Sequence, residues 1–282
     1  WLKSENTSSN ESRRLGNITR TYFGMSHKQY RKTLSILRER INVLERLMSA
    51  GKWDEIEFDK IPSKAGMKYK NAFARHDFER AKNEAVQTYA DFAKDTTKTV
   101  NAKTLYPYEC VEEAFKCRYR NMQDTQRLMT NKYWDNLADY INGAIFNGMA
   151  IVDTSGSMVR SDAAAPINVA ISLGLYCAER AKGPYAGHYI SFASRPQLIE
   201  TAGVDFVDKV DRIYATNLVD NTNIEAVFDL LLNTAIQNRC SQDEIPQNIA
   251  IISDMQFDSG CRMWNSNTDT LMEQIAQKWA NY

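Results

Sequence analysis

Residues 148–158 read GMAIVDTSGSM, and this stretch decides the fold that we expect. The apolar run 148–152 predicts a short buried strand. The run ends at a carboxylate, Asp153, which is followed by hydroxyls at Ser155 and Ser157. In an open α/β sheet, ligands bind in the loops at the carboxyl ends of strands. Three oxygen donors at alternate positions of a tight loop can converge on one point, and such donors suit a hard cation such as Mg²⁺.

The residues after this loop alternate between helix-like and strand-like patterns, which predicts an α/β domain with a mostly parallel sheet. We expect helices over 166–180, 204–214, 223–237 and 268–279, and strands over 189–193, 197–200 and 248–253. Thr222 lies next to the start of one of these helices, and Asp254 follows the last strand. Both therefore belong at the same edge of the sheet as Asp153.

The residues before the first strand predict an all-helical region. Residues 1–26 are polar and are expected to form a loosely held lead-in, with a short helix near 20–23. Periodic apolar residues predict helices over 27–50, 64–73, 77–92, 108–120 and 132–142. We place the domain boundary between the helical region, residues 1–145, and the α/β domain, residues 146–282.

The net charge of the chain is zero, but the charge is unevenly distributed. Residues 1–145 carry 26 Lys and Arg against 19 Asp and Glu, and residues 146–282 carry 9 against 16. The basic half could contact nucleic acid or could pair with the acidic half. The densest basic cluster is Lys64, Lys68, Lys70 and Arg75. It is either a contact for RNA phosphates or a solvated helix face.

The cysteines and the hydropathy pattern indicate the compartment. The five cysteines are scattered and include no C-x-x-C pair, which disfavours a zinc site or a disulfide framework. No apolar run approaches the ~20 residues of a membrane span, and no signal-peptide pattern is present. We therefore expect an intracellular, cytoplasmic protein, or a component of a particle assembled inside the cell, with no membrane partner.

The pattern Asp-x-Ser-x-Ser at 153–157 resembles the first motif of a von Willebrand factor A domain, its metal-ion-dependent adhesion site. The resemblance implies that one Mg²⁺ (or Mn²⁺ or Ca²⁺) is surrounded by Asp153, Ser155, Ser157, Thr222 and Asp254. Few carboxylates and several neutral hydroxyls leave such an ion under-neutralised, so an open coordination position attracts an acidic group of a protein partner. Since 28 residues follow Asp254, too few for a complete A domain, we expect the protein to continue beyond residue 282.

Nearly the whole chain is similar to a family of uncharacterised proteins in which a helical front half precedes a von Willebrand A half. The matching stretches include residues 53–56, 75–77, 105–109, 152–158 and 253–258. This family is similar in layout to the Ro autoantigen (TROVE-type) proteins, in which a ring of helical repeats binds small noncoding RNA and misfolded RNA ends. The resemblance implies that small noncoding or structured RNA is a further candidate partner.

These observations favour a non-enzymatic, divalent-metal-dependent binding module, within a Ro-like RNA–protein particle if the layout holds. One alternative is a structural or assembly protein, for instance of a virus particle or large complex. Another is a metal-dependent phosphohydrolase with Asp153 as nucleophile. Haloacid-dehalogenase-type phosphatases need a second Asp two residues later, where this chain has Ser155, so we expect no enzyme and no catalytic residue.

Overall fold

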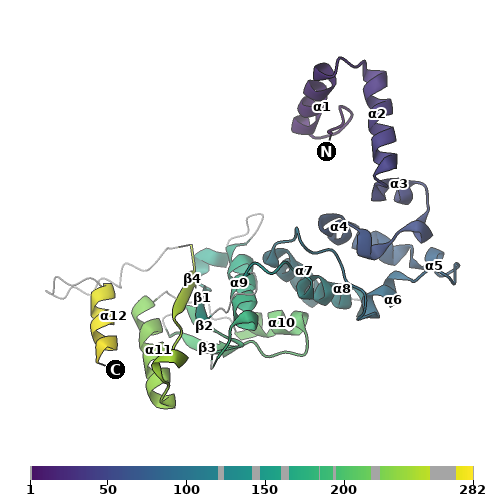
Figure 1. Ribbon diagram of the computed structural model, residues 1–282. Helices are drawn as coiled ribbons and strands as arrows, with labels where there is room; N and C mark the ends of the chain where they lie inside the picture. Colours follow the sequence, from purple (N-terminus) through teal and green to yellow (C-terminus); the bar gives the residue numbers. More distant parts are fainter. Residues whose placement is uncertain are drawn as a thin grey trace. The chain divides into compact units, whose positions relative to one another are not determined.

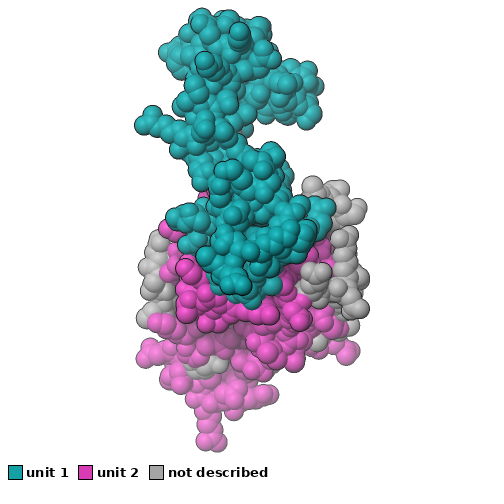
Figure 2. Space-filling view, turned by 90° about the vertical axis from the view of Figure 1, so that its right-hand side faces the viewer, with its two compact units in different colours: residues 1–61, 65–92 teal, residues 62–64, 93–282 magenta. Residues whose placement is uncertain are grey.

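A computed structural model of the protein describes residues 2–119, 124–141, 147–159, 165–183, 185–192, 195–216, 223–254 and 271–281. The chain divides into two compact units (Figure 2). Unit 1 contains Trp1–Ile61 and Ala65–Phe92, and unit 2 contains Pro62–Lys64 and Ala93–Tyr282. Each unit is described by itself below.

The regular secondary structure of unit 1 is all helical in the described residues, which confirms the predicted helical front region. Its elements are α1 (Asn10–Tyr22), α2 (His27–Arg40), α3 (Leu44–Ser49), two short 3-10 turns (Trp53–Glu55 and Phe58–Lys60), α4 (Ser63–Arg75), α5 (Asp77–Arg80) and α6 (Tyr89–Lys94) (Figure 1). The first two residues of α4 and the last two of α6 belong to unit 2.

Two of the predictions for the first fifty residues are wrong. The polar lead-in contains a full helix, α1, because the side chain of Ser9 accepts a hydrogen bond from the Ser12 amide and caps its start. The single helix expected over 27–50 is broken into α2 and α3. Asn42, at φ 48°, takes the left-handed conformation that asparagine tolerates better than most residues. The chain therefore leaves α2 at this point and starts α3 in a new direction.

The helix expected over 77–92 is also broken. The carboxylate of Asp77 accepts hydrogen bonds from the amides of Tyr89 and Ala90, at 2.5 and 3.0 Å. These amides lie in the first turn of α6, where a helix has no internal acceptors for its N–H groups. The chain must loop back between α5 and α6 to make this contact, so a continuous helix over 77–92 is excluded.

A buried arginine organises the core of unit 1. Arg80 is 4% exposed, and its guanidinium lies 4.3 Å from the centre of the Phe58 ring. It donates to the backbone carbonyls of Trp53, Ile56 and Gln87, so it ties three segments together. Desolvation lowers the pKa of Arg80 from its usual value. Arginine nevertheless stays charged at physiological pH, and its donors are satisfied by carbonyl oxygens.

Unit 2 is a mixed α/β unit, as predicted. Its elements are α7 (Pro107–Tyr119), α8 (Asp124–Asp135), β1 (Gly148–Asp153), α9 (Pro166–Arg180), β2 (His188–Phe192), β3 (Gln197–Glu200), α10 (Phe206–Thr216), α11 (Ile224–Asn238), β4 (Asn248–Ile252) and α12 (Leu271–Ala280) (Figure 1). The four strands form one sheet in the order β3-β2-β1-β4. Strand β1 is parallel to β2 and β4, and β3 is antiparallel to β2.

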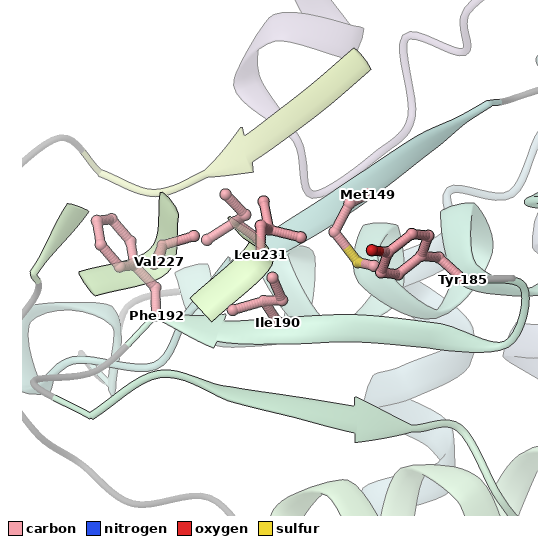
Figure 3. Packing of buried hydrophobic residues seen from close by; sticks show 7 residues of the cluster. Met149, Tyr185, Ile190, Phe192, Val227 and Leu231 are labelled. Atoms are coloured by element: carbon pink, nitrogen blue, oxygen red, sulfur yellow. The ribbon is translucent and has the colours of Figure 1, made fainter. Parts of the chain in front are cut away.

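Both faces of β1 are covered by helices, which explains its uninterrupted apolar run. On one face Met149 and Ile151 pack in a cluster with Val227 and Leu231 of α11 (Figure 3). On the other face α9 approaches so closely that a Cβ added to Gly174 would lie 2.4 Å from Cγ2 of Val152. All six residues of β1 are buried, including the carboxylate at its end.

Helices α7 and α8 pack on the α/β elements of unit 2. The rings of Phe115 of α7 and Tyr214 of α10 meet edge to face, with their centres 3.6 Å apart. Trp134 of α8 stacks on Phe206, with a distance of 4.1 Å between the ring centres. Apart from residues 62–64, the compact units divide at Phe92–Ala93, and the domain boundary predicted from the sequence at 145/146 stays a prediction. The helix expected over 132–142 is instead α8, which ends at Asp135.

The start of α10 is held to α8 by Asp205. Its carboxylate accepts two hydrogen bonds of 2.8 Å from Arg127, one from Asn131 and one from the amide of Asp208. Desolvation tends to raise the pKa of Asp205, but these hydrogen bonds outweigh it and lower the pKa below its usual value. The contribution to stability is therefore present above the unfolded-state pKa, near 3.9, and is lost as the pH falls through the folded-state pKa.

We expect Asp205→Ala to lower the free energy of unfolding by about 1 to 2 kcal/mol at neutral pH, as loss of a helix cap does. The difference from the parent protein should shrink below about pH 4. Urea unfolding at pH 7 and at acid pH measures both effects. Asp205→Asn is the control, because it keeps a capping oxygen but cannot titrate. A difference that grows on acidification would contradict this account.

Candidate metal centre

The strand register brings the polar ends of β1 and β4 together. Val152 of β1 pairs with Ile252 of β4, so Asp153 and Ser253 are the next residues on the two neighbouring strands. The Ser253 hydroxyl donates to Oδ2 of Asp153 at 2.5 Å. Strands β2 and β3 lie on one side of β1 and β4 lies on the other. The carboxyl ends of β1 and β4 therefore form the switch point at which open α/β sheets bind ligands.

The loop after β1 folds around Asp153. The Ser155 amide donates to Oδ1 of Asp153 at 2.9 Å, a local turn that aspartate commonly makes. The hydroxyls of Ser155 and Ser157 are 3.1 Å apart, so they lie on the same side of the loop. Asp153 is fully buried and Ser155 is 8% exposed. Three of the five predicted ligands are thus gathered in one loop.

These residues fit a divalent cation. Asp153 is 0% exposed, and no Lys, Arg or His in the described ranges forms an ion pair with it. A buried carboxylate without a cation is unfavourable, and a bound metal ion would supply that cation. Two neighbouring ligands of an octahedral Mg²⁺, each about 2.1 Å from the ion, lie about 3 Å apart. The two serine hydroxyls, which are hydrogen-bonded to each other at 3.1 Å, are compatible with this spacing.

The structure describes one of the two remaining predicted ligands, Asp254, and not the other, Thr222. Thr222 lies outside the described residues, which resume at 223. Asn223 follows it and caps α11, because its side chain accepts a hydrogen bond of 3.1 Å from the Ala226 amide. Asp254 is half-buried and comes two residues after the end of β4, at the same edge of the sheet as Asp153.

Among the described residues, no three His, Cys, Asp or Glu side chains come together as a metal-binding group. The predicted centre contains two carboxylates and three hydroxyls, so it is of a different type. Sequence reasoning did not single out Ser253 as a site residue. Its position directly after the apolar run of β4 could have indicated it, since two parallel strands that end at the same level bring their next residues side by side.

By helical spacing, three of the four basic residues of α4 fall on one face, namely Lys64, Lys68 and Arg75, and only Lys70 does not. Lys64 pairs with Glu109 at 2.5 Å, and Lys68 lies 4.9 Å from the centre of the Tyr69 ring. Arg75 donates from Nε to the carbonyl of Asn71. Lys70 follows Lys68 by two positions, which puts the two side chains on nearly opposite sides of the helix. The RNA contact expected at these four residues stays a prediction.

Residues 2–144 match a family model described as a domain of unknown function, DUF2828. The chain belongs to the DUF2828 family. Its residues 147–282 match a second domain of unknown function, DUF7788. The junction of the two matches lies at the sequence-based boundary of 145/146, whereas the compact units of this DUF2828 protein divide at Phe92–Ala93.

The DUF2828 chain is also similar to a viral protein, "Uncharacterized protein L728" of Acanthamoeba polyphaga mimivirus. The two are 35% identical over 269 residues, which cover 91% of this chain and 45% of the viral protein. The chain thus spans less than half the length of this relative. No solved structure gives a significant match. No helix within the described ranges is long and apolar enough to cross a membrane.

Proposed function

We propose that residues 147–282 form a von Willebrand A-like domain that binds one divalent cation at the Asp153 loop. Asp153, Ser155 and Ser157 would hold the ion, with Thr222 and Asp254 completing the set. The observation that supports this proposal best is the fully buried Asp153 carboxylate, which has no basic partner in the described ranges and accepts hydrogen bonds from the Ser155 amide and the Ser253 hydroxyl at the sheet switch point. Mg²⁺ is the favoured ion, because all these donors are oxygens.

The proposed role of the ion is to bind an acidic group of a partner protein. Five protein ligands would leave one of the six positions of an octahedral Mg²⁺ open, and an anionic ligand can fill it. The domain would therefore be a binding module and not an enzyme. The phosphohydrolase alternative remains disfavoured, because the position two residues after Asp153 holds Ser155, which is a poor general acid or base.

The experiment that tests this proposal is a Mn²⁺ and Mg²⁺ titration of the whole chain by isothermal calorimetry. We expect the double variant Ser155→Ala/Ser157→Ala to bind at least about 100-fold more weakly, since even indirect ligand partners contribute 10- to 100-fold. Thr234→Ala is a matched control, because its hydroxyl bonds the carbonyl of Leu230 within α11, away from the loop. Equal affinities of the double variant and the parent protein would refute the ligand assignment.

The Ro-like layout adds RNA as a second candidate ligand, and its test is separate. RNA binding by the whole chain is measured at about 50 and about 200 mM salt, because phosphate contacts make affinity fall steeply with salt. The measurement is made with Mg²⁺ and with chelator. Tight, salt-dependent binding would support a ribonucleoprotein role, and no binding in either condition would leave the protein–protein module or an assembly role.

A further inference from the structure

The positive charge of the front half is concentrated in its first three helices. Residues 1–52 carry 11 Lys and Arg against 4 Glu, whereas residues 53–145 carry 15 basic and 15 acidic residues. The whole excess of seven charges in residues 1–145 therefore belongs to the segment that contains α1, α2 and α3 (Figure 1).

Within residues 2–52, which the structure describes, most of the Lys and Arg side chains without an ion-pair or hydrogen-bond partner belong to helix α2. Within the described residues, no ion pair or hydrogen bond engages the side chains of five of its basic residues: Lys28, Arg31, Lys32, Arg38 and Arg40. In contrast, Arg14 of α1 pairs with Glu11, and Arg20 pairs with Glu5. Unpaired cations on one helix repel each other, so an anionic ligand on this helix would be stabilising.

The break at Asn42 leaves a groove between α2 and α3. The groove has a volume of about 880 Å³ and is lined in part by Arg31, Arg38 and Arg46. Arg46 is held by the carbonyl of Ser35 and by Glu39. The acidic residue in the lining, Glu45, already accepts a hydrogen bond from the Tyr69 hydroxyl. Arg31 and Arg38, seven positions apart on one face of α2, are thus available to an anion.

A smaller apolar hollow adjoins this groove. It has a volume of about 270 Å³ and is lined by Leu2, Leu34, Leu37, Arg38 and Ile41. Leu34 and Arg38 line both spaces. Leu37 and Ile41, which are four positions apart along the chain, are 40% and 56% exposed. Two exposed large aliphatic side chains side by side form an apolar patch on the surface. The surface therefore combines unpaired arginines with an aliphatic depression.

We propose that this surface docks an acidic amphipathic segment of a partner protein. Aspartate or glutamate side chains of the segment would pair with Arg31 and Arg38, and a leucine-like side chain would fill the hollow beside Leu37. Helical segments commonly bind in grooves through such regularly spaced apolar anchors. The choice of an acidic partner follows from charge complementarity with the segment 1–52, and it does not depend on the proposed metal centre.

The aliphatic hollow favours a protein segment over RNA as the occupant. Proteins bind single-stranded bases by stacking them on aromatic rings or guanidinium planes. The lining supplies the guanidinium groups of Arg31, Arg38 and Arg46, but none of the residues that line the groove or the hollow is aromatic. An aliphatic hollow of this size gives a base no ring to stack on, but it accommodates a leucine side chain.

The test uses the whole chain and a fluorescein-labelled peptide in which leucines at helical spacing alternate with Glu and Asp. Binding is followed by fluorescence anisotropy in the presence of a chelator. We expect Arg31→Glu/Arg38→Glu to weaken binding at least about tenfold. The matched control is Lys32→Glu/Arg40→Glu, which changes the charge of α2 equally but alters residues outside both linings. We expect the control to weaken binding clearly less.

A second variant tests the apolar hollow. Leu37→Ser/Ile41→Ser removes two exposed aliphatic side chains, so the fold should be retained, and we expect about tenfold weaker binding of the leucine peptide. Three results of the peptide measurements would overturn the proposal. They are no binding of the peptide, equal losses for the groove and control variants, and equal binding of a peptide with serine in place of leucine. Preferential binding of single-stranded RNA to the same residues would also overturn it.

Discussion

Asp153→Ala is expected to abolish binding of Mg²⁺ and Mn²⁺ while the chain stays folded. The substitution removes the buried carboxylate at the end of β1, which is hydrogen-bonded to both Ser155 and Ser253. In the metal-free protein, the burial of this charge already opposes folding. Its removal therefore costs no more than the two donors left without a partner, about 1 to 3 kcal/mol each at most.

The measurement is thermal unfolding with and without Mn²⁺. A ligand at 100 times its dissociation constant stabilises a folded protein by about 2.7 kcal/mol, so the parent protein should melt at a clearly higher temperature when the metal is present. The variant should melt at the same temperature in both conditions. Asp243→Ala, which removes an exposed carboxylate before β4, is the control and should respond to metal as the parent protein does. A metal-dependent shift in the Asp153→Ala variant would refute the proposed site.

Arg80→Ala is expected to have the largest effect on stability. The variant loses a guanidinium that bridges the backbone carbonyls of Trp53, Ile56 and Gln87, so each of these buried or part-buried carbonyls loses a donor. It also leaves a cavity beside the Phe58 ring. Breaking a buried network of this kind typically costs 3 to 5 kcal/mol, enough to unfold a marginally stable unit.

Hydrogen exchange resolved by segment is the appropriate measurement, because it reports unit 1 separately from unit 2. We expect protection to be lost over residues 53–92 and retained in β1. Arg80→Lys should restore little of this protection, since one ammonium group cannot replace the several N–H donors of a planar guanidinium. Arg75→Ala removes an exposed arginine of the same unit and is the control. Unchanged protection of residues 53–92 in Arg80→Ala would show that the network is dispensable.

The sequence alone determined the class of fold and the position of the candidate site. The apolar run before Asp153 predicted β1, and the alternation that follows it predicted the sheet and its helices. The helix expected over 166–180 and the strand expected over 197–200 have these bounds in the structure. These elements are predictable because their apolar residues repeat with the period of the element itself. Asp153, Ser155 and Ser157 could be grouped because they lie in one short loop.

Only the tertiary structure decided the features that depend on contacts between distant residues. The breaks after Arg40 and Arg80 end helices that the apolar period alone would continue. The second break is fixed by the bond of Asp77 to amides twelve and thirteen residues later. Ser253 reaches Asp153 across one hundred positions through the register of β1 and β4. A periodic pattern records which face of an element is buried, but it does not record which distant donor meets which acceptor.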